Sequence, residues 1–493
     1  MTPALVWIRN DLRLADNPAL TAAVDRGGPV IPVFIWPSED EEPWSLGAAS
    51  RWWLNRSLES LGADRESRGL RLIICRGSAE KTLADLVNTS GATAVFWNRR
   101  YEPSAISHDG TLKKNLRDRG IVAESFNGSL LYEPWTIRNG SGRAYCVFTP
   151  YWRACQTRSV APALSDAPSK LHAAEVWPRS LHLSELNLEP KVDWASGLKE
   201  TWQPGETGAK DQLRRFREQA LAAYSVGRDR PADTGTSRLS PHLHFGEISA
   251  RQVRQAILEI GGPASEVYLR QLGWREFAHH VLYHQPESPS QPLRTEFAAF
   301  PWRHDSKSLI AWQQGKTGYP LVDAGMRELW HTGWMHNRVR MVAASFLVKH
   351  LLIDWQEGAS WFWDTLVDAD LANNTLGWQW SAGCGADAAP YFRIFNPVLQ
   401  GEKFDPAGAY VRRWVPELAA MPDVFIHKPW KAPASILGAA DVTLGRSYPN
   451  PIVDHAFARA RALSALGTIS KTTTRPETFV RCYPMGNGGH GVF

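Results

Sequence analysis

Four short apolar runs decide the first part of the fold: ALVWIR at residues 4–9, PVIPVFIW at 29–36, RLIIC at 71–75 and TAVFW at 93–97. Continuous apolar runs of this length are typical of strands that are buried on both faces of a parallel sheet. Helical patterns lie between them, for example AASRWWLNRSLESLGADRESRG at 48–69. Because strands and helices alternate, the sequence predicts a doubly wound α/β domain over residues 1–130.

The rest of the chain follows a different pattern. Residues 131–206 are rich in Pro, Ser and Trp over much of their length, which predicts a long connector. From 207 to 462 the apolar residues recur with a helical period, as in SEVYLRQLGWREFAHHVLYH at 265–284, so a second, all-α domain is expected. Residues 463–493 lack that period and are predicted to be a partly mobile tail.

Composition narrows the class of protein. The chain has 493 residues, a net charge of +5, 43% hydrophobic and 21% charged residues, which is typical of a globular protein of more than one domain. The five Cys residues form no metal-binding pattern, and no metal site is expected. No apolar run is long enough to span a membrane and none resembles a signal peptide, so a cytoplasmic protein is the expectation.

Two segments carry residues that packing alone does not require. Residues 233–249, DTGTSRLSPHLHFGEIS, place Gly and hydroxyl residues ahead of a helix that begins near Ser249, which is a pattern able to hold phosphate or to cap a turn. Residues 366–406 combine acidic, amide, Trp and basic side chains around a Gly-rich turn. Arg340 precedes this segment in an apolar helix and needs a buried anion, for which Asp368 and Asp370 are the candidates.

Four motifs in this order resemble the photolyase/cryptochrome family over nearly the whole chain. They are GTSRLSPHLHFGEIS at 235–249, LGWREF at 272–277, GKTGYPLVDAGMRELWHTGWMHNRVRMVAASFLVKHLLIDW at 315–355 and DADLANNTLGWQWSAGCGADAAPYFRIFNP at 368–397. The resemblance implies an N-terminal α/β antenna domain and a C-terminal helical domain that binds FAD. It also implies a DNA-repair lyase that acts on pyrimidine dimers in light.

The resemblance assigns a set of residues to FAD. The match covers the phosphates, the rim of the flavin, an ion pair beside it and an amide that faces flavin N5. In this chain the residues implied are Tyr224, Thr236, Ser237, Arg238, Leu239, Ser240, Gln271, Arg275, Asn337, Arg340, Asp368, Asp370 and Asn374.

The same resemblance assigns residues to the dimer and to DNA. The residues expected at the dimer, as catalytic residues, are Asn374, Gln271, Asn337, Met341, Trp274 and Trp380. The residues expected to contact DNA are Arg228, Trp274, Arg338, Trp380, Arg393, Gln400 and Lys403. The implied electron-transfer chain is Trp378, Trp355 and Trp302, whereas Trp312, Trp361 and Trp363 are expected to be packing residues.

Three alternatives stay open at the level of sequence. Gln271 stands where many cyclobutane-dimer enzymes of the family have Glu, and Gln is typical of (6-4) photolyases and animal cryptochromes. The single His336 in MHNR, together with Met341, favours cyclobutane dimers. A photoreceptor without repair activity is the other alternative. For a second, light-harvesting chromophore the stretch WNRRYEP at 97–103 favours folate with Glu102 as its contact, and a deazaflavin or FMN is the alternative.

Overall fold

The computed structural model describes residues 2–37, 44–66, 69, 71–161, 166–168, 172–190, 192–388 and 392–470. The chain divides into two compact units, each built from several segments. The first unit comprises Met1–Ile137, Cys155–Gln219 and Ser237–Tyr283, and the second comprises Arg138–Ala154, Ala220–Thr236 and His284–Phe493.

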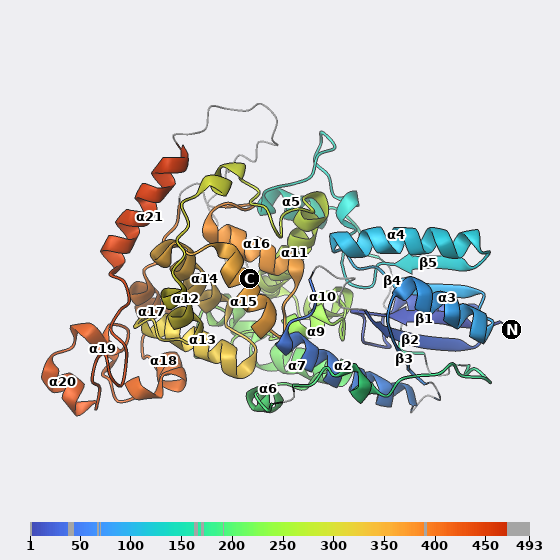
Figure 1. Ribbon diagram of the computed structural model, residues 1–493, viewed down its shortest axis with the longest axis horizontal. Helices are drawn as coiled ribbons and strands as arrows, with labels where there is room; N and C mark the ends of the chain where they lie inside the picture. The colour runs from blue at the N-terminus through green and yellow to red at the C-terminus, as the bar shows by residue number, and fades with distance from the viewer. Residues whose placement is uncertain are drawn as a thin grey trace. The chain divides into compact units, whose positions relative to one another are not determined.

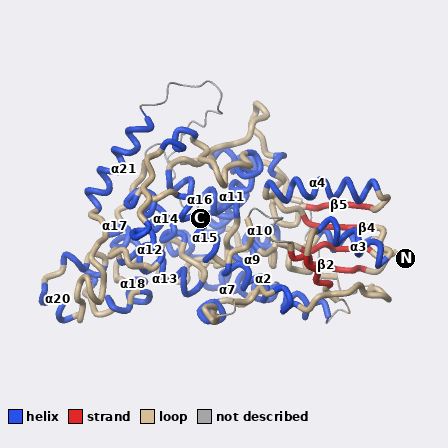
Figure 2. Tube along the Cα trace, in the orientation of Figure 1, coloured by secondary structure: helices blue, strands red, loops and turns tan. Residues whose placement is uncertain are grey.

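A five-stranded parallel sheet forms the base of the first unit, with strand order β3-β2-β1-β4-β5 (Figure 2). The strands are β1 (Ala4–Ile8), β2 (Val30–Trp36), β3 (Ile73–Arg76), β4 (Ala94–Asn98) and β5 (Val122–Phe126). The first four confirm the predicted strands and the doubly wound fold. The fifth, VAESF, is not among the predicted strands, because an edge strand has one neighbour and alternates exposed with buried residues.

Helices α1 (Pro18–Asp25), α2 (Ala48–Glu66), α3 (Ala79–Ser90) and α4 (Pro103–Asp118) complete the α/β part of the first unit (Figure 1). One face of the sheet packs against α3 and α4, and the core between them is aliphatic and aromatic. Its members include Leu5, Trp7, Val33, Val95, Leu83, Leu86, Leu112 and Leu116. Burial of these side chains, at about 25 cal/mol per Å² of apolar surface, holds the helices on the sheet.

The other described helices of the first unit follow the sheet along the chain, with α6 in the predicted connector and the rest in or at the start of the predicted helical region. They are α6 (Ser196–Thr201), α7 (Glu206–Gln219), α9 (Ser240–His244), α10 (Ala250–Leu258) and α11 (Gly262–His284). Helix α10 begins as predicted, because Ser249 and Gln252 form a capping box.

Gly246 lets the loop before α10 approach the loop after β1. Its φ is +65°, and a Cβ there would lie 2.1 Å from the carbonyl oxygen of Asn10. The amide of Leu12 donates to the carbonyl of Phe245 at 3.1 Å. Glycine is therefore required at this position on two counts, conformation and space.

The second unit is helical, as predicted for this part of the chain. Its described helices include α8 (Tyr224–Gly227), α12 (Ser306–Gln313), α13 (Pro320–Thr332), α14 (Asn337–Ser345), the π-helix η5 (Phe346–Leu351), α15 (Trp355–Thr365), α16 (Leu371–Ala382), α17 (Pro397–Phe404), α18 (Ala409–Trp414), α19 (Asp423–Ile426), α20 (Ala434–Ala439) and α21 (His455–Ser470). Helix α5 (Phe148–Gln156) contains a chain boundary of the units, because residues up to Ala154 belong to the second unit and those from Cys155 belong to the first. One large core, which contains Trp312, Phe362 and Trp378, joins α12, α15 and α16.

Helix α21 corrects the prediction that the helical pattern stops at residue 462. The helix continues to Ser470, so residues 463–470 of the predicted tail are helical. Its buried stripe is Ala458, Ala462, Ala465 and Ile469. Alanine gives little hydrophobic contrast, and the helical period is therefore weak in the sequence. The rest of the predicted tail, 471–493, lies outside the described residues.

Candidate cofactor and DNA-binding site

Arg340 and Asp368 form a buried ion pair in the second unit, as the sequence predicted. Two hydrogen bonds, of 3.0 and 2.8 Å, run from Nη2 of Arg340 to the two carboxylate oxygens of Asp368. Nε of Arg340 donates to the carbonyl of Met335 at 2.7 Å. Their side chains are 8% and 4% exposed, so both charges are removed from water and compensate each other.

Asp370, the other candidate partner of Arg340, has a different local role. It is the N-cap of α16, and its Oδ1 accepts from the backbone and side-chain nitrogens of Asn373 at 2.9 and 2.7 Å. The cap fixes the start of the helix that carries Asn374, Trp378 and Trp380.

Asn374 presents a buried hydrogen-bond acceptor that no described residue uses. Its Nδ2 donates to the carbonyl of Ala359 at 3.0 Å, which orients the amide. The residue is 7% exposed, and its Oδ1 has no hydrogen-bond partner among the described residues. Because a buried unpaired carbonyl costs about 1–3 kcal/mol, this oxygen is suited to a donor on a ligand.

The three tryptophans expected to transfer electrons belong to one core in the second unit. Trp378 is 0% exposed and Trp355 is 3% exposed. Trp302 is partly buried and packs against the same core, with its ring centroid 4.3 Å from that of Phe300. The series therefore passes from a fully buried indole to one that reaches the surface.

Trp312 lies beside Trp378 and is buried to the same degree. The two ring centroids are 6.2 Å apart in an edge-on arrangement, and the indole nitrogen of Trp312 donates to the carbonyl of Ala343 at 3.0 Å. Burial therefore does not distinguish Trp312 from Trp378, and the assignment of Trp312 to packing stays a prediction. Trp361 instead stacks on the exposed Trp330, with 5.9 Å between centroids.

Basic side chains gather around Phe404 in the second unit. The guanidinium of Arg338 lies 4.4 Å from the centre of the Phe404 ring, and Nζ of Lys403 lies 5.1 Å from it. Arg338 also pairs with Asp229 at 2.6 Å. Arg228 lies over Tyr224, 5.5 Å from the ring centre. Arg338 is thus already paired and its side chain is only 12% exposed, whereas Lys403 is exposed; contacts of these residues with DNA phosphates stay a prediction.

His336 is a further buried group, and the sequence motifs did not assign it a role in the site. Its Nδ1 accepts from the backbone nitrogen of Arg338 at 3.2 Å, so the hydrogen of the neutral ring resides on Nε2. Burial lowers the pKa of His336 to about 3. Nε2 has no partner among the described residues, and the ring remains a neutral donor. The residue lies next to Asn337, whose buried Oδ1 is likewise unpaired in the part of the chain that the structure describes.

In the first unit, the turn at Ser237 is fixed by side chains from two helices. Gln212 of α7 donates to the carbonyl of Ser237 at 2.7 Å, and the hydroxyl of Tyr268 of α11 donates to its Oγ at 3.1 Å. Arg238 has a φ of +51° and places its guanidinium 4.6 Å from the centre of the Trp202 ring. This rigid turn of hydroxyls, backbone amides and a cation has the donor set that a pyrophosphate requires.

Helix α11 of the first unit carries the other expected residues. The side-chain amide of Gln271 contacts the carbonyl of Val267 at 3.4 Å, and Trp274 is 7% exposed. Arg275 donates to the carbonyl of Ser129 at 2.9 Å. Of the other predicted site residues, Met341, Leu239 and Trp380 are buried, Thr236, Arg393 and Gln400 are partly buried, and Ser240 is exposed.

Glu276, also on α11, is a buried acid that the sequence motifs did not single out. It is 1% exposed and accepts from the backbone amides of Leu131 and Tyr132 at 2.8 and 3.2 Å. Burial raises its pKa from 4.5 to about 7. The side chain therefore connects α11 to the segment after β5, and it keeps its proton in the folded chain at pH values where an unfolded chain loses it.

We expect Glu276→Gln to stabilise the protein relative to wild type increasingly as pH rises from 5 to 8. Between pH 4.5 and about 7 the folded state binds the proton that the unfolded state releases, so wild-type stability falls with pH in this window, by up to about 3 kcal/mol. Gln cannot ionise, and its amide oxygen can still accept from Leu131. Denaturant unfolding at several pH values measures the difference, and a constant difference would show that Glu276 is already ionised at pH 5.

At the switch point between β1 and β4, where doubly wound folds bind nucleotides, buried polar side chains bond to one another. Nδ2 of Asn98 donates to Asp11 and Asn17, both at 2.7 Å. Arg9 pairs with Asp109 at 2.8 Å. These buried side chains hydrogen-bond directly across the carboxyl ends of the two strands.

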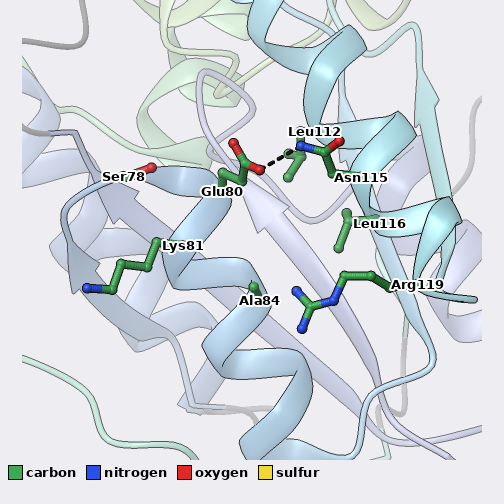
Figure 3. A pocket seen from close by; sticks show the side chains of 8 residues that line it. All are labelled: Ser78, Glu80, Lys81, Ala84, Leu112, Asn115, Leu116 and Arg119. Atoms are coloured by element: carbon green, nitrogen blue, oxygen red, sulfur yellow. Dashed lines mark hydrogen bonds between the residues drawn. The ribbon is translucent and has the colours of Figure 1, made fainter.

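Glu102, the residue expected at a second chromophore, is the N-cap of α4 and pairs with Arg100 at 3.3 Å. A cavity of about 290 Å³ lies elsewhere in this unit, between α3 and α4 (Figure 3). Glu80 and Asn115 hydrogen-bond across it at 2.6 Å, and Lys81 and Arg119 lie at its edge. None of the predicted site residues lines it, and it is below the usual size of a ligand pocket.

Two absences hold for the described part of the chain. No group of three or more His, Cys, Asp or Glu side chains that could hold a metal ion occurs there. None of its helices combines the length and apolar character needed to cross a membrane.

Comparison with known proteins places these residues in a family. The family model of the DNA photolyase domain matches residues 4–169, and that of the FAD binding domain of DNA photolyase matches residues 268–468. The chain is 52% identical to a deoxyribodipyrimidine photo-lyase of Agrobacterium fabrum over 96% of this chain and 99% of that one.

Two further comparisons agree with the first. Cryptochrome-2 of Arabidopsis thaliana is 42% identical over 93% of this chain and 78% of its own length. The crystal structure of a bacterial class III photolyase from Agrobacterium tumefaciens superposes with a TM-score of 0.93, at 51% identity, over 96% of this chain and 98% of that one. The chain belongs to the photolyase/cryptochrome family.

Proposed function

We infer that this protein is a deoxyribodipyrimidine photo-lyase, a lyase that splits cyclobutane pyrimidine dimers in DNA with light and FAD. Full-length similarity to a deoxyribodipyrimidine photo-lyase at 52% identity supports the activity. The structural observation that supports the proposal most directly is that the buried amide oxygen of Asn374 has no hydrogen-bond donor among the described residues. Reduced flavin carries an N–H at N5, whereas oxidised flavin does not, so this oxygen fits the form of FAD that can donate an electron.

The residues that would hold FAD are those named from the resemblance, and their local structure fits the cofactor. The turn at Ser237 and Arg238 supplies hydroxyl, amide and guanidinium donors for the pyrophosphate. The Arg340–Asp368 pair and the N-cap Asp370 supply polar groups for the edge of the flavin. Bound FAD, when reduced and excited, supplies the electron that opens the cyclobutane ring.

The protein's own contribution is placement. Arg228, Arg338 and Lys403 bind phosphates and position the strand, which makes affinity dependent on salt. Trp274 and Trp380 offer indole faces to the flipped bases, and each stacking contact contributes about 1–3 kcal/mol. Gln271 and Asn337 donate hydrogen bonds to the dimer's carbonyls, and Met341 packs beside them. Trp378, Trp355 and Trp302 would relay electrons from an external reductant at the surface to oxidised FAD.

A cryptochrome-like photoreceptor is the second candidate, because Cryptochrome-2 is similar to the chain at 42% identity. A (6-4) photolyase is a third, because of Gln271. The neutral acceptor at Asn374 favours repair over a photoreceptor, and the single His336 in MHNR together with Met341 favours cyclobutane dimers over the (6-4) lesion.

One repair experiment separates these candidates. The purified protein, with its flavin fully reduced, is mixed with an oligothymidylate that contains cyclobutane dimers, and absorbance near the thymine maximum is followed in blue light and in darkness. Recovery in light alone supports the proposal. Failure with fully reduced FAD bound would rule it out, and a (6-4) lesion would then be tested before a photoreceptor is considered.

We propose three finer points with the function. A second, light-harvesting chromophore is bound in the α/β part, folate first and deazaflavin or FMN as alternatives, with Glu102 as a contact. A related archaeal photolyase structure from Sulfolobus tokodaii holds two FAD molecules. The protein acts as a cytoplasmic monomer, with antenna, connector and catalytic regions at 1–130, 131–206 and 207–462, the last extended by helix α21 to Ser470. Chromophore extraction and sedimentation test the first and second points.

A further inference from the structure

Lys349 is a buried cation without a carboxylate partner among the described residues. It lies in the π-helix η5 and is 3% exposed. Its Nζ donates to the carbonyl of Arg393 and lies 4.4 Å from the centre of the Phe392 ring. A buried ammonium normally requires an anion. A π-helix is rare in proteins, and those that occur are often found at functional sites. Burying the ammonium of Lys349 without a carboxylate costs folding free energy, which suggests that the residue has a function.

The groups that Lys349 contacts belong to one short segment, residues 392–395. A second anchor holds the same segment, because the backbone nitrogen of Phe395 donates to Oγ of Ser345 at 3.3 Å. Ser345 ends α14 and Lys349 follows it by one turn. The segment is thus fixed from the core at two points, and the side chain of Arg393 leaves it toward Trp380, 6.0 Å from the centre of that ring.

We propose that Lys349 is a positioning residue for damaged DNA, which holds the backbone of residues 392–395 from within the core so that Arg393 stays over Trp380. The inference rests on the proposed function, since it assigns Arg393 and Trp380 to DNA and the dimer. Lys349 itself does not touch the ligand. Lys349 keeps Arg393 in a fixed position relative to the Trp380 ring before DNA binds. Less conformational entropy is then lost on binding.

The charge of Lys349 gives the anchor a dependence on pH. Burial, and next the nearby Arg393, lower its pKa to about 7, while Cys384 acts in the opposite direction. His350, whose own pKa burial lowers to about 3, is the other titratable group that interacts with it, and that ring is neutral near pH 7. Below pH 7 an ammonium donates to the carbonyl of Arg393. Above it a neutral amine donates more weakly, so affinity for the dimer should fall as pH rises through 7.

Lys349→Met tests the proposal in the full-length holoenzyme, with Arg393→Ala and the double variant completing a cycle. The readouts are the affinity for a dimer-containing oligonucleotide and its dependence on salt. Each phosphate contact contributes about one unit to the slope of log K against log salt. If Lys349 acts through Arg393, both single variants lose about one unit of slope, and the double variant loses no more than either. Lys403→Met is the control. This exposed lysine does not act through Arg393, so in a double variant with Arg393→Ala the two losses of slope should add.

Two controls separate positioning from general damage to the fold. FAD content and photoreduction should match wild type in Lys349→Met, since neither uses residues 392–395. Lys349→Arg keeps a donor that stays charged, so it should bind like wild type at pH 6 and lose the decrease above pH 7. It also preserves the test if the Met variant does not fold.

Three results would overturn the proposal: wild-type affinity and slope in Lys349→Met, additive losses in the double variant, or an unchanged pH profile in Lys349→Arg. Failure of the proposed function appears separately, as a wild-type protein that neither binds nor repairs the dimer.

Discussion

Asp368→Ala is expected to destabilise the second unit by about 3–5 kcal/mol, because it leaves the guanidinium of Arg340 buried without its anion. Arg340 is 7% exposed and lies between Met335 and Asp368, so water cannot replace the carboxylate easily. Most of this loss of stability comes from leaving the charge of Arg340 buried and unpaired. Replacing both residues by apolar ones should therefore cost less than replacing Asp368 alone. Denaturant unfolding followed by circular dichroism measures the effect.

A surface pair with the same nitrogen–oxygen distance provides the control. Arg412 and Asp423 are also 2.8 Å apart, but the Asp423 side chain is 64% exposed. Asp423→Ala should cost at most about 1 kcal/mol, because solvent screens the exposed charges. In the double variant Arg340→Met with Asp368→Leu, both buried charges are gone, and part of the stability should return. Equal effects of the two single alanine variants would contradict the assignment of Arg340–Asp368 as a buried, mutually dependent pair.

Trp378→Phe is expected to abolish reduction of oxidised FAD by blue light while leaving repair by chemically reduced enzyme intact. If Trp378 is the first electron donor, its removal stops the transfer at the first step, because phenylalanine is much harder to oxidise. FAD binding should persist, since the indole is fully buried in the core. Absorbance of oxidised flavin under anaerobic illumination with an external reductant measures the rate.

Trp312→Phe is a closely matched control for this experiment. The two indoles have the same burial, lie 6.2 Å apart and belong to one core, so both substitutions remove similar volume from similar surroundings. Both variants should lose stability, and Trp312→Phe should retain photoreduction. Photoreduction at the wild-type rate in Trp378→Phe, or its loss in both variants alike, would contradict a specific electron-transfer role for Trp378.

The core around Trp378 also explains a neighbouring glycine. A Cβ at Gly358 would lie 2.1 Å from the far edge of the Trp378 ring. The helix α15 therefore accepts the lower intrinsic helix propensity of glycine so that the indole can pack closely.

Local sequence determined the elements whose residues repeat with a strong period. The buried strands β1 to β4 follow from their continuous apolar runs, the helices α7 and α10 follow from apolar spacing, and the capping box at Ser249 follows from residue type. Strand β5 and the end of α21 do not follow from apolar spacing, because an edge strand and an alanine stripe give weak contrast between buried and exposed positions.

In the candidate site, too, some features follow from the sequence and others depend on tertiary packing. That Arg340 needs an anion follows from its place in an apolar helix, but the choice of Asp368 over Asp370 depends on how α14 and α16 pack. Asp229 with Arg338, and Lys349 with Arg393, are pairs that no sequence spacing indicates. Trp312 and Trp378 are the same residue type and are equally buried in one core, so the family motifs distinguish them, whereas neither sequence spacing nor burial does.

Sequence by itself thus determined the periodic elements and, through the four family motifs, the residue types brought to the site. Tertiary structure decided which buried charge meets which partner and which polar atoms remain without one. The physical reason is that a period of two or 3.6 residues is a local property of the backbone, whereas desolvation and pairing of a charge depend on groups that are distant along the chain.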